Sequence, residues 1–168
     1  MAMDSSGLAN KIKSKTEQLD TPEKANNALW EAICEYVEAN AEVVYQWSAV
    51  DPDGSLDPTT TWTGTIITGG SLSPNGMKTP EAALSQLSSD MNSNVMTWTV
   101  KPDPGFSTSG PTITGPTINI KMSMAEDRDS ALESISSDII DGIKAAIPPV
   151  HSGSHGAYTG ATTSGVIK

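Results

Sequence analysis

The chain has one cysteine, one phenylalanine and no long apolar run among its 168 residues. A single cysteine, Cys34, excludes an intrachain disulfide and a cysteine-rich zinc site, and we expect it to be a small buried side chain. No segment approaches the ~20 apolar residues that span a bilayer. Residues 1–13 lack the apolar core of a signal peptide. We therefore predict a soluble protein that is made in a cytoplasm and has no membrane partner.

Positive charge is also scarce, because 10 basic residues face 20 acidic ones and the formal net charge is −10. A protein that binds nucleic acid neutralises phosphates with clustered Lys and Arg. The nearest approach to such a cluster is Lys11, Lys13 and Lys15, which we interpret as the solvated face of a helix. The composition therefore predicts no direct sequence-specific binding of nucleic acid. An acidic surface would also suit the wall of a channel through which DNA slides.

Large apolar residues are concentrated in one stretch, from Thr21 to Trp47. Thr21 and Pro22 form a helix-start signal, and Glu23 complements the positive end of the helix dipole. An apolar stripe follows with a period near 3.6, made by Leu29, Ile33, Tyr36, Val37 and Val44. The helix is expected to end either at Asn40, with a strand through Val43, Tyr45 and Trp47, or at Val44. The rest of the chain is expected to pack on this helix.

The same patterns predict the remaining elements. Asp51–Gly54 is expected to form a turn, and residues 69–76 and 101–110 are expected to form loops. The expected helices cover residues 7–19, 79–91 and 130–146, and the expected strands cover 60–68, 94–100 and part of 112–122. We predict an α+β fold in which a mixed or antiparallel sheet of about four strands packs with three to four helices.

The ends of the chain are poorer in core-forming residues than its middle. We predict an N-terminal arm or short helix (1–20), a single α+β domain (21–149) and a C-terminal arm (150–168). The C-terminal segment is expected to be either disordered or ordered by a neighbouring subunit, because Gly, Ser and Thr dominate it.

An internal similarity indicates two α-β-β units. Thr-Pro-Glu occurs at 21–23 and 79–81, and in both copies a glycine follows a tryptophan by seven residues, at Trp47–Gly54 and Trp98–Gly105. Coincidence is the alternative, because Thr-Pro-Glu is a common helix start.

The chemistry-bearing residues form no recognised catalytic pattern. His151 and His155, the only histidines, have the H-x₃-H spacing of zinc ligands on a helix, but Pro148-Pro149 before them opposes a helix. We interpret them as loop histidines, with a pH-dependent contact as an alternative. The segment from Asp51 to Asp57 lacks the glycine and glutamate positions of a calcium loop. No serine elbow, P-loop or dinucleotide fingerprint occurs, so no catalytic residue and no cofactor is predicted.

The four tryptophans, Trp30, Trp47, Trp62 and Trp98, permit two interpretations. Exposed together, they would form a carbohydrate-binding platform. Each lies in an expected helix or strand with apolar neighbours, which favours core packing or a subunit interface.

Across most of its length the chain resembles small virion structural proteins of tailed, myovirus-like bacteriophages. The resemblance lies in the segments ALWEAICEYVEANAEVVYQW, DPDGSLDP, GTIITGGSLSP and SHGAYTGATTSGVI. It implies a non-enzymatic subunit of the tail, neck or baseplate, made in the host cytoplasm and located in the virion, with itself and other virion proteins as partners. A capsid decoration protein and a module that binds carbohydrate or a host surface are the alternatives. The expected interface residues are Leu8, Ile12, His151, His155, Tyr158, Val166 and Ile167.

Overall fold

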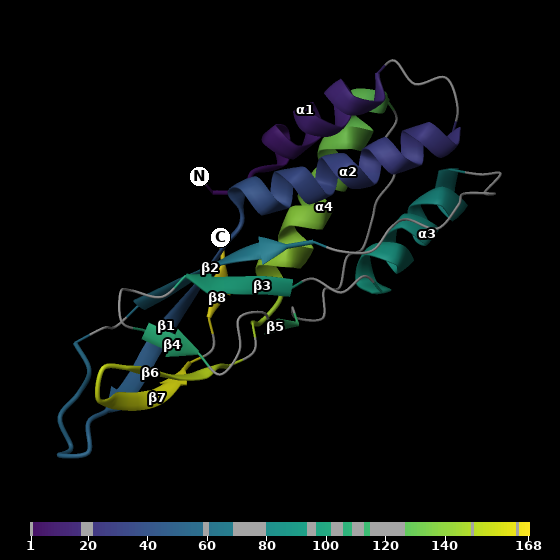
Figure 1. Cartoon of the computed structure of the whole chain (residues 1–168). Helices are drawn as coiled ribbons and strands as arrows, with labels where there is room; N and C mark the ends of the chain where they lie inside the picture. Colours follow the sequence, from purple (N-terminus) through teal and green to yellow (C-terminus); the bar gives the residue numbers. More distant parts are fainter. Residues whose placement is uncertain are drawn as a thin grey trace.

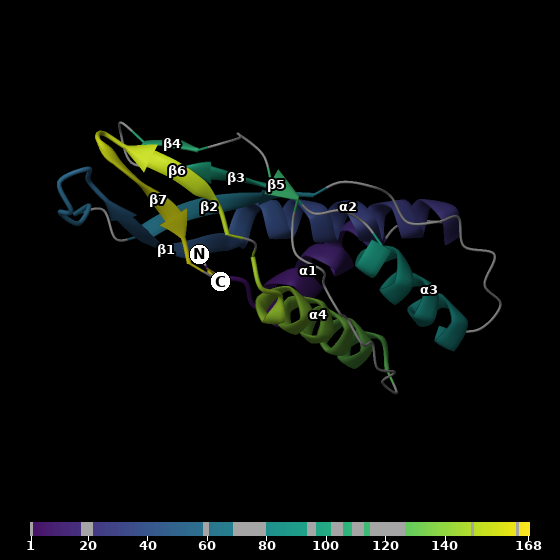
Figure 2. The same cartoon turned by 90° about the horizontal axis from the view of Figure 1, so that it is seen from below.

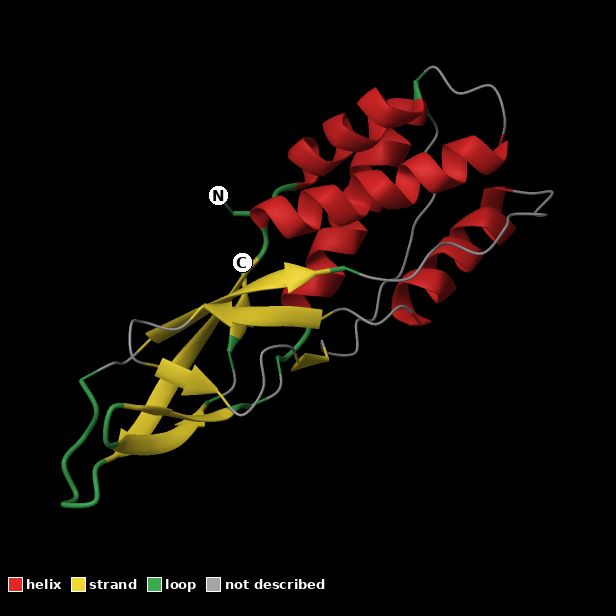
Figure 3. Ribbon diagram, in the orientation of Figure 1, coloured by secondary structure: helices red, strands yellow, loops and turns green. Residues whose placement is uncertain are grey.

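The computed structural model describes residues 2–17, 22–58, 61–68, 80–93, 97–101, 106–108, 113–114, 127–148, 150–163 and 165–168. Helices gather at one end of the molecule and strands at the other (Figures 1 and 3). The elements in chain order are α1 (Ser5–Thr16), α2 (Pro22–Asn40), β1 (Glu42–Val50), β2 (Thr61–Ile67), α3 (Pro80–Ser93), β3 (Thr97–Lys101), β4 (Phe106–Thr108), β5 (Ile113–Thr114), α4 (Arg128–Ala145), β6 (Ser152–His155), β7 (Tyr158–Thr162) and β8 (Val166–Ile167). The predicted α+β class is confirmed.

Helix α1 is short but firmly held. It begins after Asp4, whose carboxylate accepts a hydrogen bond from the Gly7 N–H at 2.7 Å and caps the first turn. Leu8 and Ile12, one turn apart, are fully buried, and α1 packs against both α2 and α4. The Tyr36 hydroxyl of α2 also connects α2 to the start of α1, because it accepts a hydrogen bond from the Asp4 N–H at 3.0 Å.

Helix α2 ends at Asn40 and passes into β1 through one residue, Ala41. The Asn40 side-chain amide donates a hydrogen bond to the Tyr36 carbonyl at 2.8 Å and satisfies a free carbonyl of the last turn. Of the two predicted helix ends, Asn40 is therefore confirmed and Val44 is wrong. No described helix combines the length and the apolar composition that crossing a bilayer would need.

The sheet is antiparallel and has β1 at its centre. Its strand order is β4-β6-β7-β1-β2-β3-β5, and β8 also pairs with β1, beyond the end of β7. Figure 2 shows that the sheet is curled, so that β4 and β6 turn away from the plane of β1. The strands outnumber the predicted four because several are only two to four residues long.

One continuous core joins the two ends of the molecule. On β1 the residues at alternate positions, from Val43 to Ala49, point inward and are buried, as the pleat requires. They share a cluster with α1, α2 and α4, which contribute Leu8, Ile12, Trp30, Ile33, Val37, Ile139 and Ile143 among others. The interpretation of the tryptophans as core residues is confirmed for Trp30, Trp47 and Trp62, and the side chain of Trp98 lies outside the described residues.

The two terminal segments are part of the fold. Of the two alternatives predicted for residues 1–20, the structure has the short helix, α1, which is part of the core. The segment 150–168, predicted to be an arm, contains β6, β7 and β8, which extend the sheet. Strands β7 and β8 pair with the central strand β1 and contain the strand formers Tyr158, Val166 and Ile167. Strand β6 has the weak sequence Ser-Gly-Ser-His and is held by pairing with β7 and β4. Gly156, with φ of 59°, permits the tight turn between β6 and β7.

Two further sequence interpretations have mixed outcomes. The predicted loop over 101–110 contains β4, which pairs with β6 instead. The order α2-β1-β2 is followed by α3-β3-β4-β5, in which β3 pairs antiparallel with β5 while the intervening β4 pairs with β6. Internal duplication nevertheless stays a prediction. The expected loop over 69–76 and most of the expected strand over 112–122 lie outside the described residues.

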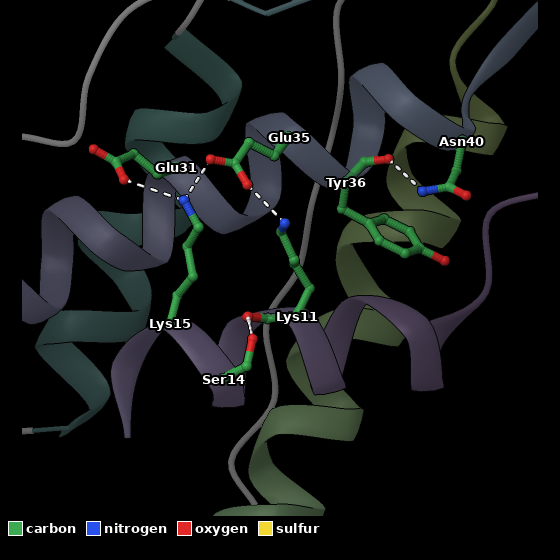
Figure 4. Close-up of polar contacts among 7 residues, drawn as sticks. All are labelled: Lys11, Ser14, Lys15, Glu31, Glu35, Tyr36 and Asn40. Carbon is green, nitrogen blue, oxygen red and sulfur yellow. Dashed lines mark hydrogen bonds and ion pairs between the residues drawn. The ribbon is translucent and has the colours of Figure 1, made fainter. Parts of the chain in front are cut away.

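The lysines of α1 lie at the surface and each forms an ion pair within the chain. Lys11 pairs with Glu35 of α2 at 2.7 Å, and Lys15 pairs with Glu31 at 3.3 Å and also with Glu35 (Figure 4). Lys13 turns to the other neighbour and pairs with Asp129 of α4 at 2.9 Å. The three lysines therefore form ion pairs beside the contacts that α1 makes with α2 and α4.

Replacing Lys15 by methionine is expected to leave the midpoint of thermal unfolding unchanged within error. Exposed ion pairs contribute little, because salt screens them and ordering long side chains costs entropy. Calorimetry of both proteins at low and high salt measures the effect. A marked fall of the midpoint at low salt that disappears at high salt would instead show that these pairs hold α1 in place.

Candidate functional site

The β6–β7 hairpin brings both histidines to the inner side of the curled sheet. His151 precedes β6 and accepts a hydrogen bond from the Thr162 N–H at its carbonyl, at 2.8 Å. Its ring nitrogen Nε2 lies 2.8 Å from the Tyr45 hydroxyl, and the two rings meet edge to face at 4.8 Å. His151 is 3% exposed, and burial lowers the pKa of its imidazole below the ordinary value. The neutral ring is therefore part of the packed interior.

His155 takes part in a second inner cluster, at the far end of the hairpin. Its Nδ1 lies 3.4 Å from Asp57, whose side chain is completely buried. The same carboxylate oxygen accepts a hydrogen bond from the Trp47 indole N–H at 3.0 Å, and Trp47 stacks on Trp62 with ring centroids 4.3 Å apart. Asp57 thus ties the β1–β2 connection to the core and to the hairpin, which is a structural role.

The two histidine clusters do not form one shared metal site in the described part of the chain. Residues four apart on a strand point to one side but lie roughly 13 Å apart, too far to share one ion. No group of three or more His, Cys, Asp or Glu in the described residues has the arrangement of a metal site. The segment Asp51–Asp57 is a turn, as predicted: Asp53 accepts from the Ser55 N–H at 2.8 Å while Asp57 points inward.

The predicted interface residues are placed in three different environments. Leu8, Ile12 and Ile167 are buried in the chain's own core, and His151 is buried against Tyr45, so in this fold these four side chains are not exposed to a neighbouring subunit. Their apolar spacing reflected intrachain packing. Tyr158 is partly buried against the core, and His155 is held by Asp57. Only Val166, which is 54% exposed, lies on an open surface.

That surface is the outer face of the sheet, which we define as the outward-pointing residues of β1 and its neighbours. Strand registers place Val166, Val44, Thr63 and Lys101 of β3 in one cross-strand row. They place Val50 beside Thr159 and Leu56 in another row at the opposite end. The residues between and around these rows are Glu42, Gln46, Ser48, Thr61, Thr65, Ile67, Ser152, Ser154 and Ala161.

The outer face differs from the rest of the protein surface in charge. Among β1, β2, β6, β7 and β8 only Glu42 carries a formal charge at neutral pH. Helices α2, α3 and α4 carry ten acidic and three basic residues. Lys168 lies opposite Glu42, and Lys101 of β3 is in register with Thr63, so the face has few charges and they are of both signs. Burying such a face costs less than burying the acidic helices, so it is the part of the described surface best suited to contact another protein.

Exposed apolar side chains gather on the same face. The described residues include six exposed large hydrophobic side chains, and four of them lie on the outer face: Val50, Leu56, Ile67 and Val166. The other two, Ile147 and Val150, lie in the connection between α4 and β6. The sequence analysis missed Val50, Leu56 and Ile67, although the alternation along β1 already marked Val50 as outward-pointing.

A hollow of about 370 Å³ lies beside the Glu42 end of the outer face. The C-terminal turn of α2 and the ends of β1 and β2 form it, with Glu38, Asn40, Thr63, Thr65 and Lys168 among its lining residues. Glu38 already accepts hydrogen bonds from the Thr68 N–H and hydroxyl at 2.9 and 2.8 Å, so its carboxylate is committed to a structural contact.

Lowering the pH is expected to destabilise the fold through His151. Because burial depresses the folded-state pKa of His151, the unfolded chain binds the extra proton more readily. The stabilisation is therefore complete above the unfolded value near 6.5 and is lost as the pH falls below it toward the folded pKa. Urea unfolding between pH 7.5 and 5 measures this, with His151→Gln as the comparison. The variant should show a smaller decrease, and an equal decrease in both proteins would contradict the assignment.

Comparisons with protein-family models, with curated proteins and with solved structures find no match to this chain. The function must therefore be argued from the residues and surfaces themselves. The three tryptophans whose side chains are described are at most 7% exposed, so none of them offers a carbohydrate-binding platform.

Proposed function

We propose that this chain is a non-enzymatic structural subunit of a bacteriophage virion, in the tail, neck or baseplate, and that it acts through subunit–subunit assembly. The observation that carries the proposal is the outer face of the sheet. Among the described residues it gathers four of the six exposed large hydrophobic side chains, and its charged positions are few: Glu42, Lys168 opposite it, and Lys101 of β3 in register with Thr63, on a chain whose net charge is −10. Apolar side chains that lie next to each other on an exposed face favour protein–protein contact, and here Val166 lies beside Val44 and Leu56 beside Val50.

Two further features support an assembly role. The potentially reactive groups are used internally: His151 contacts Tyr45, and Asp57 is shared by Trp47 and His155. One hydrophobic core also connects the helices to the sheet, which suits a subunit that is in contact with several neighbours. The resemblance to small myovirus virion proteins then suggests the kind of assembly, with copies of this chain and other virion proteins as partners.

The test is to look for the chain in purified virions of the phage that carries the gene. Mass spectrometry of density-gradient fractions should find its peptides in constant ratio to the major capsid protein. Gold-labelled antibodies against the chain should mark the tail, neck or baseplate, whereas labelling of the capsid shell would favour a decoration protein. Peptides that separate from the particles across the gradient would contradict the proposal.

A further inference from the structure

The outer face of the sheet has a definite arrangement of apolar and polar positions along β1. Val44 lies near one end with Val166 beside it, and Val50 lies at the other end with Leu56 beside it. The outward-pointing residues between the two valines are Gln46 and Ser48. Val44 and Val50 are each three residues from Trp47, so the pattern along the strand is symmetric about Trp47.

Charge indicates what kind of partner this face fits. Two copies of a chain with net charge −10 repel each other wherever their acidic helices meet. The outer face avoids that repulsion, because Glu42 is the one acidic residue of its described strands, and two basic residues share the face with it: Lys168 opposite Glu42, and Lys101 in register with Thr63. The outer face of a second copy has the same low charge and the same spacing of strands as the outer face of the first. Such self-complementarity is what an isologous contact between identical subunits requires.

The size of the face is also adequate. A nine-residue strand extends roughly 30 Å, and β1 with one neighbouring strand on each side covers roughly 14 Å, so the projected area of this central part is on the order of 420 Å². Side-chain relief makes the accessible area larger than this projection. A standard stable interface buries about 800 Å² per partner, which is within reach of this face together with its rim.

We propose that two copies of this chain pack through the outer faces of their sheets. The two-fold axis lies between the two faces, runs across the direction of the β1 strands and is level with Trp47. This inference rests on the proposed assembly function and names the surface and the partner. In this arrangement the two β1 strands run antiparallel, and Val44 of each copy lies over Val50 of the other. Glu42 then lies at the rim, beyond the end of the opposing strand, and the acidic helices remain on the outside of the dimer.

A charge at the centre of the face should prevent this contact. Ser48→Arg puts an exposed cation on the sheet of the free chain, where water solvates it, but the dimer would bury that cation without a partner. We expect the dissociation constant to rise on the order of 100-fold or more. The matched control is Asn27→Arg, which puts the same charge on the exposed side of α2 and should leave the dissociation constant within about 3-fold.

Sedimentation velocity of the three full-length proteins over a range of concentrations provides the measurement, with circular dichroism to confirm that each is folded. A wild-type dimer that Ser48→Arg dissociates and Asn27→Arg preserves is the expected result. A dimer that persists in Ser48→Arg overturns the proposed face but leaves the assembly function standing. A wild-type monomer found in virions also overturns this inference alone, whereas a monomer absent from virions contradicts both proposals.

Discussion

Replacing Trp62 by alanine is expected to lower the free energy of unfolding by about 3–5 kcal/mol. Trp62 is 1% exposed and stacks on Trp47, which in turn donates its indole hydrogen bond to Asp57. Removing the indole leaves a cavity and withdraws the stacking surface that positions Trp47. Urea unfolding followed by far-ultraviolet circular dichroism measures the change without depending on tryptophan fluorescence.

The matched control for Trp62 is its neighbour Thr61, which points to the outer face of the same strand. Thr61→Ala should cost less than about 1 kcal/mol, because only the local strand preference changes. If Trp62→Ala fails to fold, the milder Trp62→Phe should still fold with an intermediate loss. A cost for Trp62→Ala as small as that of Thr61→Ala would show that the Trp47–Trp62 stack is not part of the core.

Replacing Leu8 by alanine is expected to cost about 2–5 kcal/mol of unfolding free energy. Leu8 of α1 is completely buried, and α1 packs against α2 and α4, although Leu8 is only the eighth residue of the sequence. A flexible terminal arm would show no such loss, because its side chains would have no intrachain contacts to lose. Chemical unfolding of the isolated protein therefore distinguishes a core helix from an assembly arm.

Asn10→Ala, an exposed position on the same helix, is the control for Leu8 and should change stability by less than about 0.5 kcal/mol. Normal stability of Leu8→Ala together with defective incorporation into particles would contradict the structure and restore the interpretation of α1 as an arm.

The parts of the fold that local signals determine could be predicted from the sequence. Helix α2 and helix α4 have strong apolar periodicity, and Thr21-Pro22 and Pro148-Pro149 mark one end of each. The alternation through Val43, Tyr45 and Trp47 predicted β1 in the same way. These signals act over a few residues and do not depend on the rest of the chain.

The C-terminal strands and the contacts of the histidines could not be predicted, because they depend on distant partners. Strand β6 has the sequence Ser-Gly-Ser-His, which has little intrinsic strand preference, and it forms through pairing with β7 and β4. His151 contacts the hydroxyl of Tyr45, which is 106 residues away in the sequence. Similarly, the outer face becomes visible only once the strand order shows that Val44, Val166, Val50 and Leu56 share one side of the sheet.

The most direct test of the account is chemical cross-linking between two copies at the centre of the outer face. In a Cys34→Ser background, cysteines are placed at Ser48 or, as the control, at Asn27 of α2, and each protein is treated with a bis-maleimide whose spacer is roughly 10 Å, the separation of packed sheets. The account predicts a covalent dimer for the Ser48→Cys protein and little for the Asn27→Cys protein. No dimer from Ser48→Cys, or equal amounts from both, would contradict assembly through this face.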